Sequence, residues 1–600
     1  MKYDEDMLRY YTDELAYLRR MGREFAQQHP MVAERLELQD GHPADPHVER
    51  LVESFAFLTA RIQHELDARF PEISTSLLTV LYPHLVQPVP PLATARFRID
   101  ARRGKFTTGH TVPKNTTLFA YGSSGAACRF RTCYPVTVWP VYIQEAALEP
   151  PARFDFLSSN LRVAGVLRIR IGAIVGELSE LTMDSLRFYL NPRSGPAFGL
   201  YELLFSALEG ICILPEGSEV PIRLPSESLS AVGFARDDDL LPHPPNAHAA
   251  YRLIQEYFHF PDKFLLFDVN HLAGHKSNRH FDLLFLLNRV PRSRLSVHAD
   301  AVELGCTPVA NLFPRTTEPI RLDQRQLYYR LTPDMRREKT TEIHSVLKIS
   351  GSTNPLEETR AYSPFYSHRH AESGTPAGPF WHARRVLTGR EELPGTEIYL
   401  SFLDLAFKPT DPPEEVVFAH TLCTNRWLAV EVPPGALLQM EQVGPVTCTC
   451  LVRPTPPVYP PLGGPAVWRL ISNLSLSHVS LQKGSEGLAA LQEILRVYCF
   501  GDQPSMLQQI QGIRELSTRE TTLRIGRDAW RGFCPGTEIT LTFDESLYAG
   551  GSAFLFATVL RHFLALYTSV NSFTQLVARR VNREEDWKRW PPLAGFQPLI

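Results

Sequence analysis

Histidines and carboxylates gather in this 600-residue chain at places where they could bind a metal ion. The densest group is His42, Asp45, His47 and Glu49, in the stretch GHPADPHVERL. One metal ion would need these side chains to converge. His47 and Glu49 are two residues apart, so on a helix they point away from each other. The spacing therefore disfavours a metal site here.

The same stretch is typical of a helix start. Asp45 is a favoured N-cap, and Pro46 has a φ suited to the first helical turn. Glu49 falls where the helix dipole stabilises a carboxylate. Apolar residues then recur at helical spacing until the next proline. We predict a packed helix from Pro46 to Pro71, followed by a third, shorter helix.

Two further stretches contain several histidines: His271, His275 and His280 in NHLAGHKSNRH, and His368, His370 and His382 in residues 363–385. Glycine, serine and asparagine make both stretches resemble surface loops, and neither offers a complete ligand set. Phosphate-binding, dinucleotide-binding and hydrolase motifs are absent from the sequence. We expect no enzyme activity, no metal and no cofactor. The open alternative is a metal-dependent hydrolase, or another enzyme that uses these loops.

Composition narrows the class of protein. The net charge is −3, from 62 basic and 65 acidic residues, which gives no basic excess for binding nucleic acid. The nine cysteines are scattered, and no apolar signal segment follows Met1, so we expect a reduced, cytoplasmic protein. Cys448 and Cys450 lack zinc-ligand spacing and are interpreted as small apolar strand residues.

The pattern of hydrophobic residues predicts an α+β, multidomain protein. Its first part is helical, and most of the remainder alternates with period two between proline and glycine turns. The apolar stretch at residues 552–570 is interrupted by Arg561 and His562, which favours a buried helix and no direct membrane insertion. Tyr257, Phe258 and Phe264 favour a core segment over an interface. The predicted regions are a helical region at 1–86, β-rich domains at 87–245 and 246–452, and an α/β domain at 453–600.

The first helix has an additional pattern. Its apolar or small residues recur in steps of three and four at Leu8, Tyr11, Leu15, Leu18, Gly22 and Phe25. This is a heptad seam, narrower than the stripe of a helix that lies on a globular core. It predicts packing against another helix, from this chain or from a partner.

Several long stretches, taken in order, resemble one known family. They are YYTDELAYLRRMGREFAQQHP, DPHVERLVESFAFLTARIQ, FPEISTSLLTVLYPHL, YRLIQEYFHFPDKFLLFD, GCTPVANLF, LCTNRWL, FCPGTEITLTFDE and FATVLRHFLALYTSVNSFTQL. Together they are similar to the TssF family, whose members are baseplate subunits of bacterial type VI secretion systems. The resemblance covers essentially the whole chain. It implies a structural protein that resembles the wedge proteins of contractile-tail baseplates.

The resemblance also implies partners. Family members form a wedge with TssG and TssK, typically with a second TssF copy, and the wedges surround the VgrG spike hub. The baseplate is the platform on which the TssB–TssC sheath polymerises around the Hcp tube, and it docks at the inner-membrane complex. We therefore expect the partner-binding residues to include Leu8, Tyr11, Leu15, Leu18 and Phe25, facing TssG or the second TssF copy.

Overall fold

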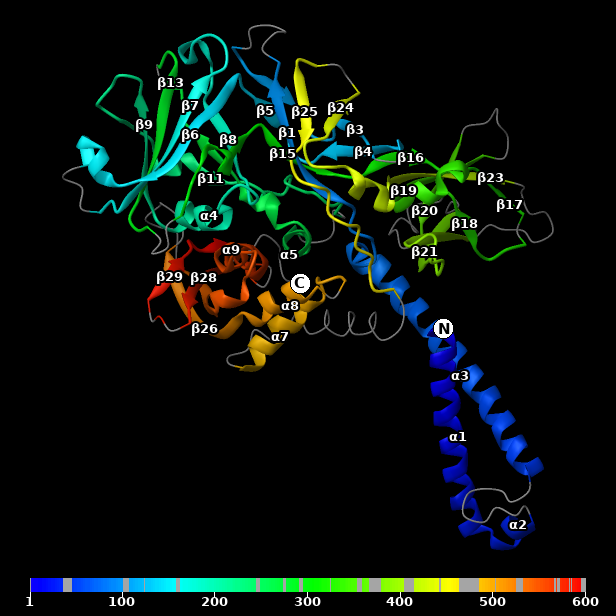
Figure 1. Cartoon of the computed structure of the whole chain (residues 1–600). Coiled ribbons are helices and arrows are strands. Elements are labelled where there is room, and N and C mark those ends of the chain that lie inside the picture. The colour runs from blue at the N-terminus through cyan, green and yellow to red at the C-terminus, as the bar shows by residue number, and fades with distance from the viewer. Residues whose placement is uncertain are drawn as a thin grey trace. The chain divides into compact units, whose positions relative to one another are not determined.

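The chain divides into two compact units in the computed structural model: residues 1–81 with 461–472, and residues 82–460 with 473–600 (Figure 1). The structure describes residues 2–35, 46–100, 107–122, 125–157, 162–243, 249–273, 277–290, 295–323, 325–352, 359–365, 379–403, 415–441, 444–462, 485–501, 503–524, 533–565, 568, 572–581, 583 and 585–594.

The first unit is helical, as predicted. It contains α1 (Lys2–Gln28), α2 (Pro30–Arg35) and α3 (Pro46–Leu81). The predicted start at Pro46 is confirmed, whereas Asp45 and His42 lie outside the described residues. The predicted break at Pro71 is wrong, because α3 continues to Leu81. A proline inside a helix costs about 3 kcal/mol, but two separate helices would leave the N–H and C=O groups at the new helix ends without intrahelical partners.

The second unit is organised around a closed barrel. Its strand order is β1 (Leu92–Ile99), β15 (Cys306–Ala310), β4 (Ala127–Thr132), β3 (Thr117–Tyr121), β24 (Leu437–Met440) and β25 (Val446–Cys450). Phe97 and Phe130 fill the barrel core together with Cys448 and Cys450. The interpretation of these two cysteines as small apolar strand residues is confirmed.

Two antiparallel sheets are built from strands that lie, in the sequence, between β4 and β15 of the barrel. The five-stranded sheet has the order β10 (Ile222–Arg223), β9 (Leu208–Pro215), β13 (His280–Leu287), β7 (Gly165–Ala173) and β6 (Val141–Glu149). The four-stranded sheet has the order β11 (Leu229–Ala231), β12 (Leu266–Asn270), β8 (Ser185–Leu190) and β14 (Val302–Leu304), and β2 (His110–Val112) pairs with β5 (Val136–Val138). Phe267 stacks on Phe188 and meets Phe285 edge-on, which joins the two sheets. The boundary predicted at residue 245 therefore runs through both of these sheets.

An eight-stranded sheet follows. It contains β16 (Phe313–Thr316), β17 (Ile320–Leu322), β18 (Tyr329–Leu331), β19 (Glu342–Ser352), β20 (Arg360–Pro364), β21 (Phe380–Leu387), β22 (Thr396–Leu403) and β23 (Glu415–Thr424). The loop predicted over residues 363–385 is wrong at both ends, because residues 363–364 belong to β20 and residues 380–385 belong to β21. Phe380 and Trp381 are buried in this strand. The free energy gained by burying them outweighs the turn preference of the glycine and proline residues that precede them in the sequence.

Two of the family-like stretches meet where this sheet joins the barrel. The backbone N–H of Asn425 donates to Asn311 Oδ1 (2.6 Å), and Asn311 Nδ2 donates to Asn425 Oδ1 (2.9 Å). Both side chains also bond to the backbone of Arg129 on β4. GCTPVANLF and LCTNRWL thus encode one buried junction, in which the two asparagines bond to each other and to the surrounding backbone.

The end of the chain forms a sheet with three helices. The strands are β26 (Ile513–Arg524), β27 (Phe533–Phe543), β28 (Phe573–Arg580), β29 (Asp586–Arg589) and β30 (Leu593–Ala594), and the helices are α7 (Ser485–Arg496), α8 (Pro504–Gln511) and α9 (Ala553–Leu564). α9 is buried along most of its length and contacts α4 (Ala197–Ser206) and α5 (Ala249–His259), so the predicted buried helix is confirmed. Among the described helices, none is both long and apolar enough to cross a bilayer.

Aromatic rings connect the start of the second unit with these helices. His84 lies almost parallel to Tyr498 at a ring distance of 6.5 Å, and Tyr251 stacks on the same tyrosine at 6.0 Å. His84 is buried, and neither ring nitrogen has a hydrogen-bond partner among the described residues. Burial lowers the pKa of His84 to about 3 because the charged imidazolium would lose its hydration.

Replacing His84 with phenylalanine should weaken the acid sensitivity of the protein. An unfolded histidine titrates near 6.5, so neutral His84 contributes stability above that pH. This contribution is lost as the pH falls from 6.5 towards 3, at about 1.4 kcal/mol per pH unit. Between pH 7 and pH 5, His84→Phe should therefore lose about 2 kcal/mol less free energy of unfolding than the wild type.

Urea titrations at the two pH values measure this difference. The matched control is His298→Phe, since His298 is exposed; it should keep the wild-type pH dependence. Equal pH dependence in His84→Phe and wild type would show that His84 is not a source of the acid sensitivity.

Candidate partner-binding surface

The two long helices of the first unit pack side by side (Figure 1). Ala56 and Ala60, one turn apart on α3, are fully buried, and their small side chains permit close approach of a neighbouring helix. Arg19 on α1 forms an ion pair with Glu49 on α3. Glu49 therefore has a partner 30 residues away in addition to its favourable place in the first turn of α3.

The predicted interface residues on α1 fall into two groups. Tyr11, Leu15 and Leu18 are half-buried on the helix that packs against α3. Leu8 and Phe25 are more open, with exposed fractions of 64% and 39%. The structure thus shows α1 packing on a helix of its own chain, and contact of the same seam with a partner stays a prediction.

A second apolar surface lies on α3 and was missed as an interface by the sequence reasoning. Leu51, Phe55, Leu58 and Ile62, here called the α3 stripe, are 71%, 58%, 55% and 59% exposed. Their steps of four, three and four residues place them on one side of the helix. At 3.6 residues per turn, that side lies opposite the buried Ala56 and Ala60. The periodicity was visible in the sequence, but it predicted a packed helix and not an open face.

A contiguous group of large aromatic and aliphatic side chains is unusual on a protein surface. Isolated exposed apolar residues are common, whereas contiguous patches mark sites of interaction with proteins or membranes. The α3 stripe has the a/d spacing by which one helix receives the side chains of another. Its chemistry is therefore that of a helix–helix contact.

The histidines that could have bound metal are placed apart from one another or lie outside the described residues. His271 Nδ1 is 3.1 Å from Ser228 Oγ, and His280 Nδ1 is 3.6 Å from Glu216 Oε1. His382 lies half-buried on β21, and burial lowers its pKa. His275, His368 and His370 lie outside the described residues. Within the described part of the chain, no group of three or more His, Cys, Asp or Glu side chains could hold a metal ion.

Comparison with known proteins identifies the family. The family model described as "Type VI secretion system, TssF" matches residues 3–597. The chain belongs to the TssF family. A relative within TssF, the type VI secretion system component TssF1 of Pseudomonas aeruginosa, is 35% identical over 622 residues and covers 99% of both chains. The family resemblance drawn from the sequence is confirmed.

Solved structures also resemble this TssF chain. One is a chain in a cryo-electron microscopy structure of the type VI secretion system TssK–TssF–TssG baseplate subcomplex, with a TM-score of 0.73 and 25% identity. It covers 91% of this chain and 98% of that one. Another, in the baseplate complex from the type VI secretion system, has a TM-score of 0.58 and 25% identity, and covers 99% and 100% of the two chains. The predicted α+β, multidomain architecture of a baseplate wedge protein is confirmed.

Proposed function

We propose that this chain is a structural subunit of the baseplate wedge and assembles with TssG and TssK. The α3 stripe is the observation that supports this proposal most directly, because its large apolar side chains are exposed on one helical face, as at sites of protein–protein contact. The solved relative in the TssK–TssF–TssG subcomplex is similar over 91% of this chain.

The proposal extends to the complete particle. A second TssF copy joins the wedge, and the wedges surround the VgrG hub. The assembled baseplate is the platform for the TssB–TssC sheath and the Hcp tube, and it lies in the cytoplasm, docked at the inner-membrane complex. These steps rest on the family membership of the chain. In this role the protein acts by binding other subunits, and catalysis is not required.

Helix–helix contact is the proposed mode of binding in the first unit. On α1 the contact uses Leu8, Tyr11, Leu15, Leu18 and Phe25, and on α3 it uses the α3 stripe. The two surfaces lie on different helices, so the helical pair can be held from two sides. Burying each leucine or phenylalanine contributes about 1.5–3 kcal/mol, and the ion pair between Arg19 and Glu49 links α1 to α3.

Replacing both Leu15 and Leu18 with glutamate tests the α1 part of the proposal. Two buried charges at a helical seam should abolish co-purification of the chain with co-expressed TssG and TssK. The measurement is the amount of TssG retained by the tagged chain after affinity purification. Circular dichroism and proteolysis of the isolated variant report whether the second unit stays folded. Wild-type retention of TssG would refute the role of α1.

A further inference from the structure

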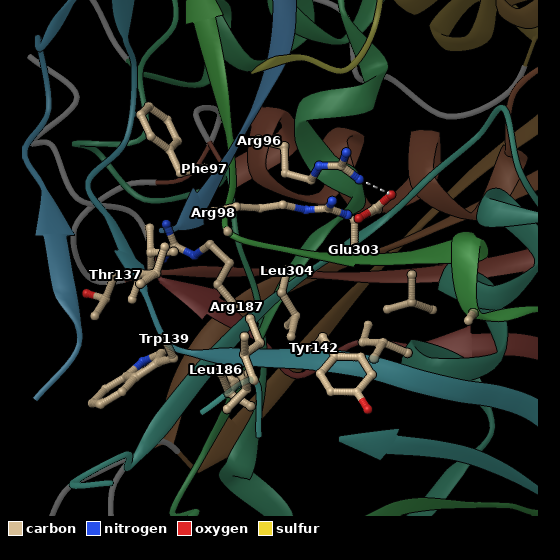
Figure 2. A pocket seen from close by; sticks show the side chains of 18 of the residues that line it. Arg96, Phe97, Arg98, Thr137, Trp139, Tyr142, Leu186, Arg187, Glu303 and Leu304 are labelled. Atoms are coloured by element: carbon tan, nitrogen blue, oxygen red, sulfur yellow. Dashed lines mark hydrogen bonds and ion pairs between the residues drawn. The ribbon is translucent and has the colours of Figure 1, made fainter. Parts of the chain in front are cut away.

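A cavity of about 360 Å³ lies in the second unit, where the barrel meets the neighbouring sheets (Figure 2). Its walls come from β1, the connection between β5 and β6, β8 and β14. Gly305 lets β14 lie close to β1: its φ is +68°, and a Cβ there would come within 2.4 Å of the carbonyl oxygen of Phe97. The volume falls in the lower part of the range of ligand-binding pockets.

One wall of the cavity is cationic. Figure 2 shows Arg96 and Arg98 side by side, extending toward Glu303. Arg96 Nη1 donates to Glu303 Oε1 at 2.7 Å, and its Nε is buried without a hydrogen-bond partner among the described residues. Arg98 is exposed, and the described residues provide no ion pair for its guanidinium. Glu303 thus pairs with Arg96 alone, and the Arg98 guanidinium has no carboxylate partner among the described residues, so hydrogen-bond donors on this wall are unused.

The other charged residues that line the cavity form no hydrogen bond or ion pair with Arg96 or Arg98 among the described residues. Arg187 is occupied elsewhere, by two bonds of 2.8 and 2.9 Å to Asp268. Asp300 is exposed and forms no ion pair within the described residues. The spare donors of the cationic wall are thus available to an anionic group that enters from outside.

The opposite wall is aromatic and reaches the surface. Trp139, Leu186 and Tyr142 lie across the cavity from the two arginines (Figure 2). Gly172 keeps space for the tyrosine, since a Cβ there would lie 3.1 Å from the Tyr142 ring. The exposed side chains of Tyr142 and Ile174 continue the apolar wall out of the cavity.

We propose that this cavity receives an acidic peptide segment of another subunit of the assembly. A carboxylate of the segment binds the spare donors of Arg96 and Arg98, and an adjacent apolar side chain packs on Trp139 and Tyr142. Arginine forks bind carboxylates through two parallel hydrogen bonds, which fixes the orientation of the group. The inference rests on the proposed function, since it names a second contact through which this chain holds a partner.

The apolar rim favours a peptide over a small carboxylate molecule. A small ligand would be enclosed by the cavity and would leave Ile174 and its neighbour Val175 open to water, with exposed fractions of 43% and 45%. A peptide segment that enters the cavity would also cover this apolar rim. Protein interfaces bury apolar surface around a central polar contact in the same way.

A photo-crosslinker tests the proposal in the assembled complex. p-Benzoylphenylalanine replaces Tyr142 in the full chain, expressed with all its baseplate and sheath partners, and mass spectrometry identifies the crosslinked peptide. We expect a peptide of another subunit with aspartate or glutamate beside an apolar residue. Adding Arg98→Glu should reduce this product about tenfold or more, whereas Arg98→Lys should retain part of it. Arg236→Glu, the same charge change at an exposed site outside the cavity, should leave it unchanged.

The possible results of this experiment distinguish a failure of the peptide site from a failure of the proposed function. The same crosslinker at Tyr121, which is exposed on β3 outside the cavity, gives the background that Arg98→Glu should not alter. No crosslink at Tyr142 above this background, or one insensitive to Arg98→Glu, overturns the peptide site even if TssG and TssK co-purify. A small anion in the cavity without a crosslinked peptide also overturns it. Failure of co-purification by the wild-type chain overturns both.

Discussion

Replacing Phe55 and Leu58 with glutamate is expected to abolish binding of TssG while the isolated chain stays folded. Both side chains lie in the α3 stripe and are more than half exposed, so the isolated chain loses little packing. In the wedge, each would lose about 1.5–3 kcal/mol of apolar burial, and the new carboxylates would have to be desolvated. The sum corresponds to a loss of affinity of about 100-fold or more.

The measurement is retention of co-expressed TssG by the tagged chain, followed by titration of the purified proteins. Phe533→Glu is the matched control, because Phe533 is 76% exposed on the hairpin of β26 and β27 and lies in the other unit. This control should retain TssG as the wild type does. Unchanged retention by the Phe55 and Leu58 double variant would remove the α3 stripe from the interface.

The α3 stripe variants also resolve an ambiguity of the α1 variants. Leu15 and Leu18 are half-buried on the helix that packs on α3, so glutamate there disturbs the helical pair itself. Phe55 and Leu58 lie on the side of α3 away from the fully buried alanines. Loss of TssG in both variants would indicate a partner contact, whereas loss in the α1 variants alone would indicate damage to the pair.

Periodicity predicted which segments are helical and which are strands, but not which surfaces remain open. The spacing of Leu51, Phe55 and Leu58 is the same whether a neighbouring helix covers them or not. Pro71 shows a second limit, since the local cost of a proline was outweighed by the helix that continues beyond it. Local preference is a weak guide where longer-range structure decides.

Sites built from distant strands were also beyond the sequence reasoning. Arg96 and Glu303 are 207 residues apart, and strand pairing between β1, β15 and the neighbouring sheets brings them together. The same holds for Asn311 and Asn425, which belong to separate family-like stretches and form one junction. The composition of each stretch gave no signal of these pairings, because register and sheet order are set by contacts across the whole unit.

The segment YRLIQEYFHFPDKF shows how a core prediction can hide a polar centre. Tyr257, Phe258 and Phe264 are buried, as predicted for a core segment. Within the same segment, Glu256 and Lys263 are fully buried and form an ion pair. Sequence periodicity placed the aromatic residues correctly but gave no indication that three charges, Arg252 among them, would be enclosed with them.

This ion pair anchors a neighbouring loop. Glu256 Oε1 accepts the backbone N–H groups of Leu240 at 2.8 Å and Leu241 at 3.1 Å. Lys263 Nζ donates to the carbonyl oxygen of Asp238 at 3.0 Å. Arg252 is buried as well, and its Nε lies 3.6 Å from Glu256 Oε2, so one enclosed carboxylate faces two basic groups. These three charges depend on one another because they have almost no access to water.

Replacing Lys263 with methionine should destabilise the second unit by about 3 kcal/mol, because two buried charge-assisted hydrogen bonds are lost and Glu256 keeps only Arg252, at 3.6 Å, as a basic partner. Adding Glu256→Gln should not recover this loss: the glutamine oxygen can still accept from Leu240 and Leu241, but the buried Arg252 guanidinium then has no carboxylate among the described residues. Urea unfolding followed by tryptophan fluorescence measures both variants.

An exposed ion pair provides the comparison. Arg496 and Glu493 lie on the surface of α7, so Arg496→Met should cost no more than about 1 kcal/mol. If Lys263→Met has an effect as small as this control, Glu256 takes up a proton or rearranges at little cost, and the anchoring role is wrong. If the double variant is clearly more stable than Lys263→Met, Arg252 does not need the Glu256 carboxylate, and the interdependence of the three buried charges is wrong.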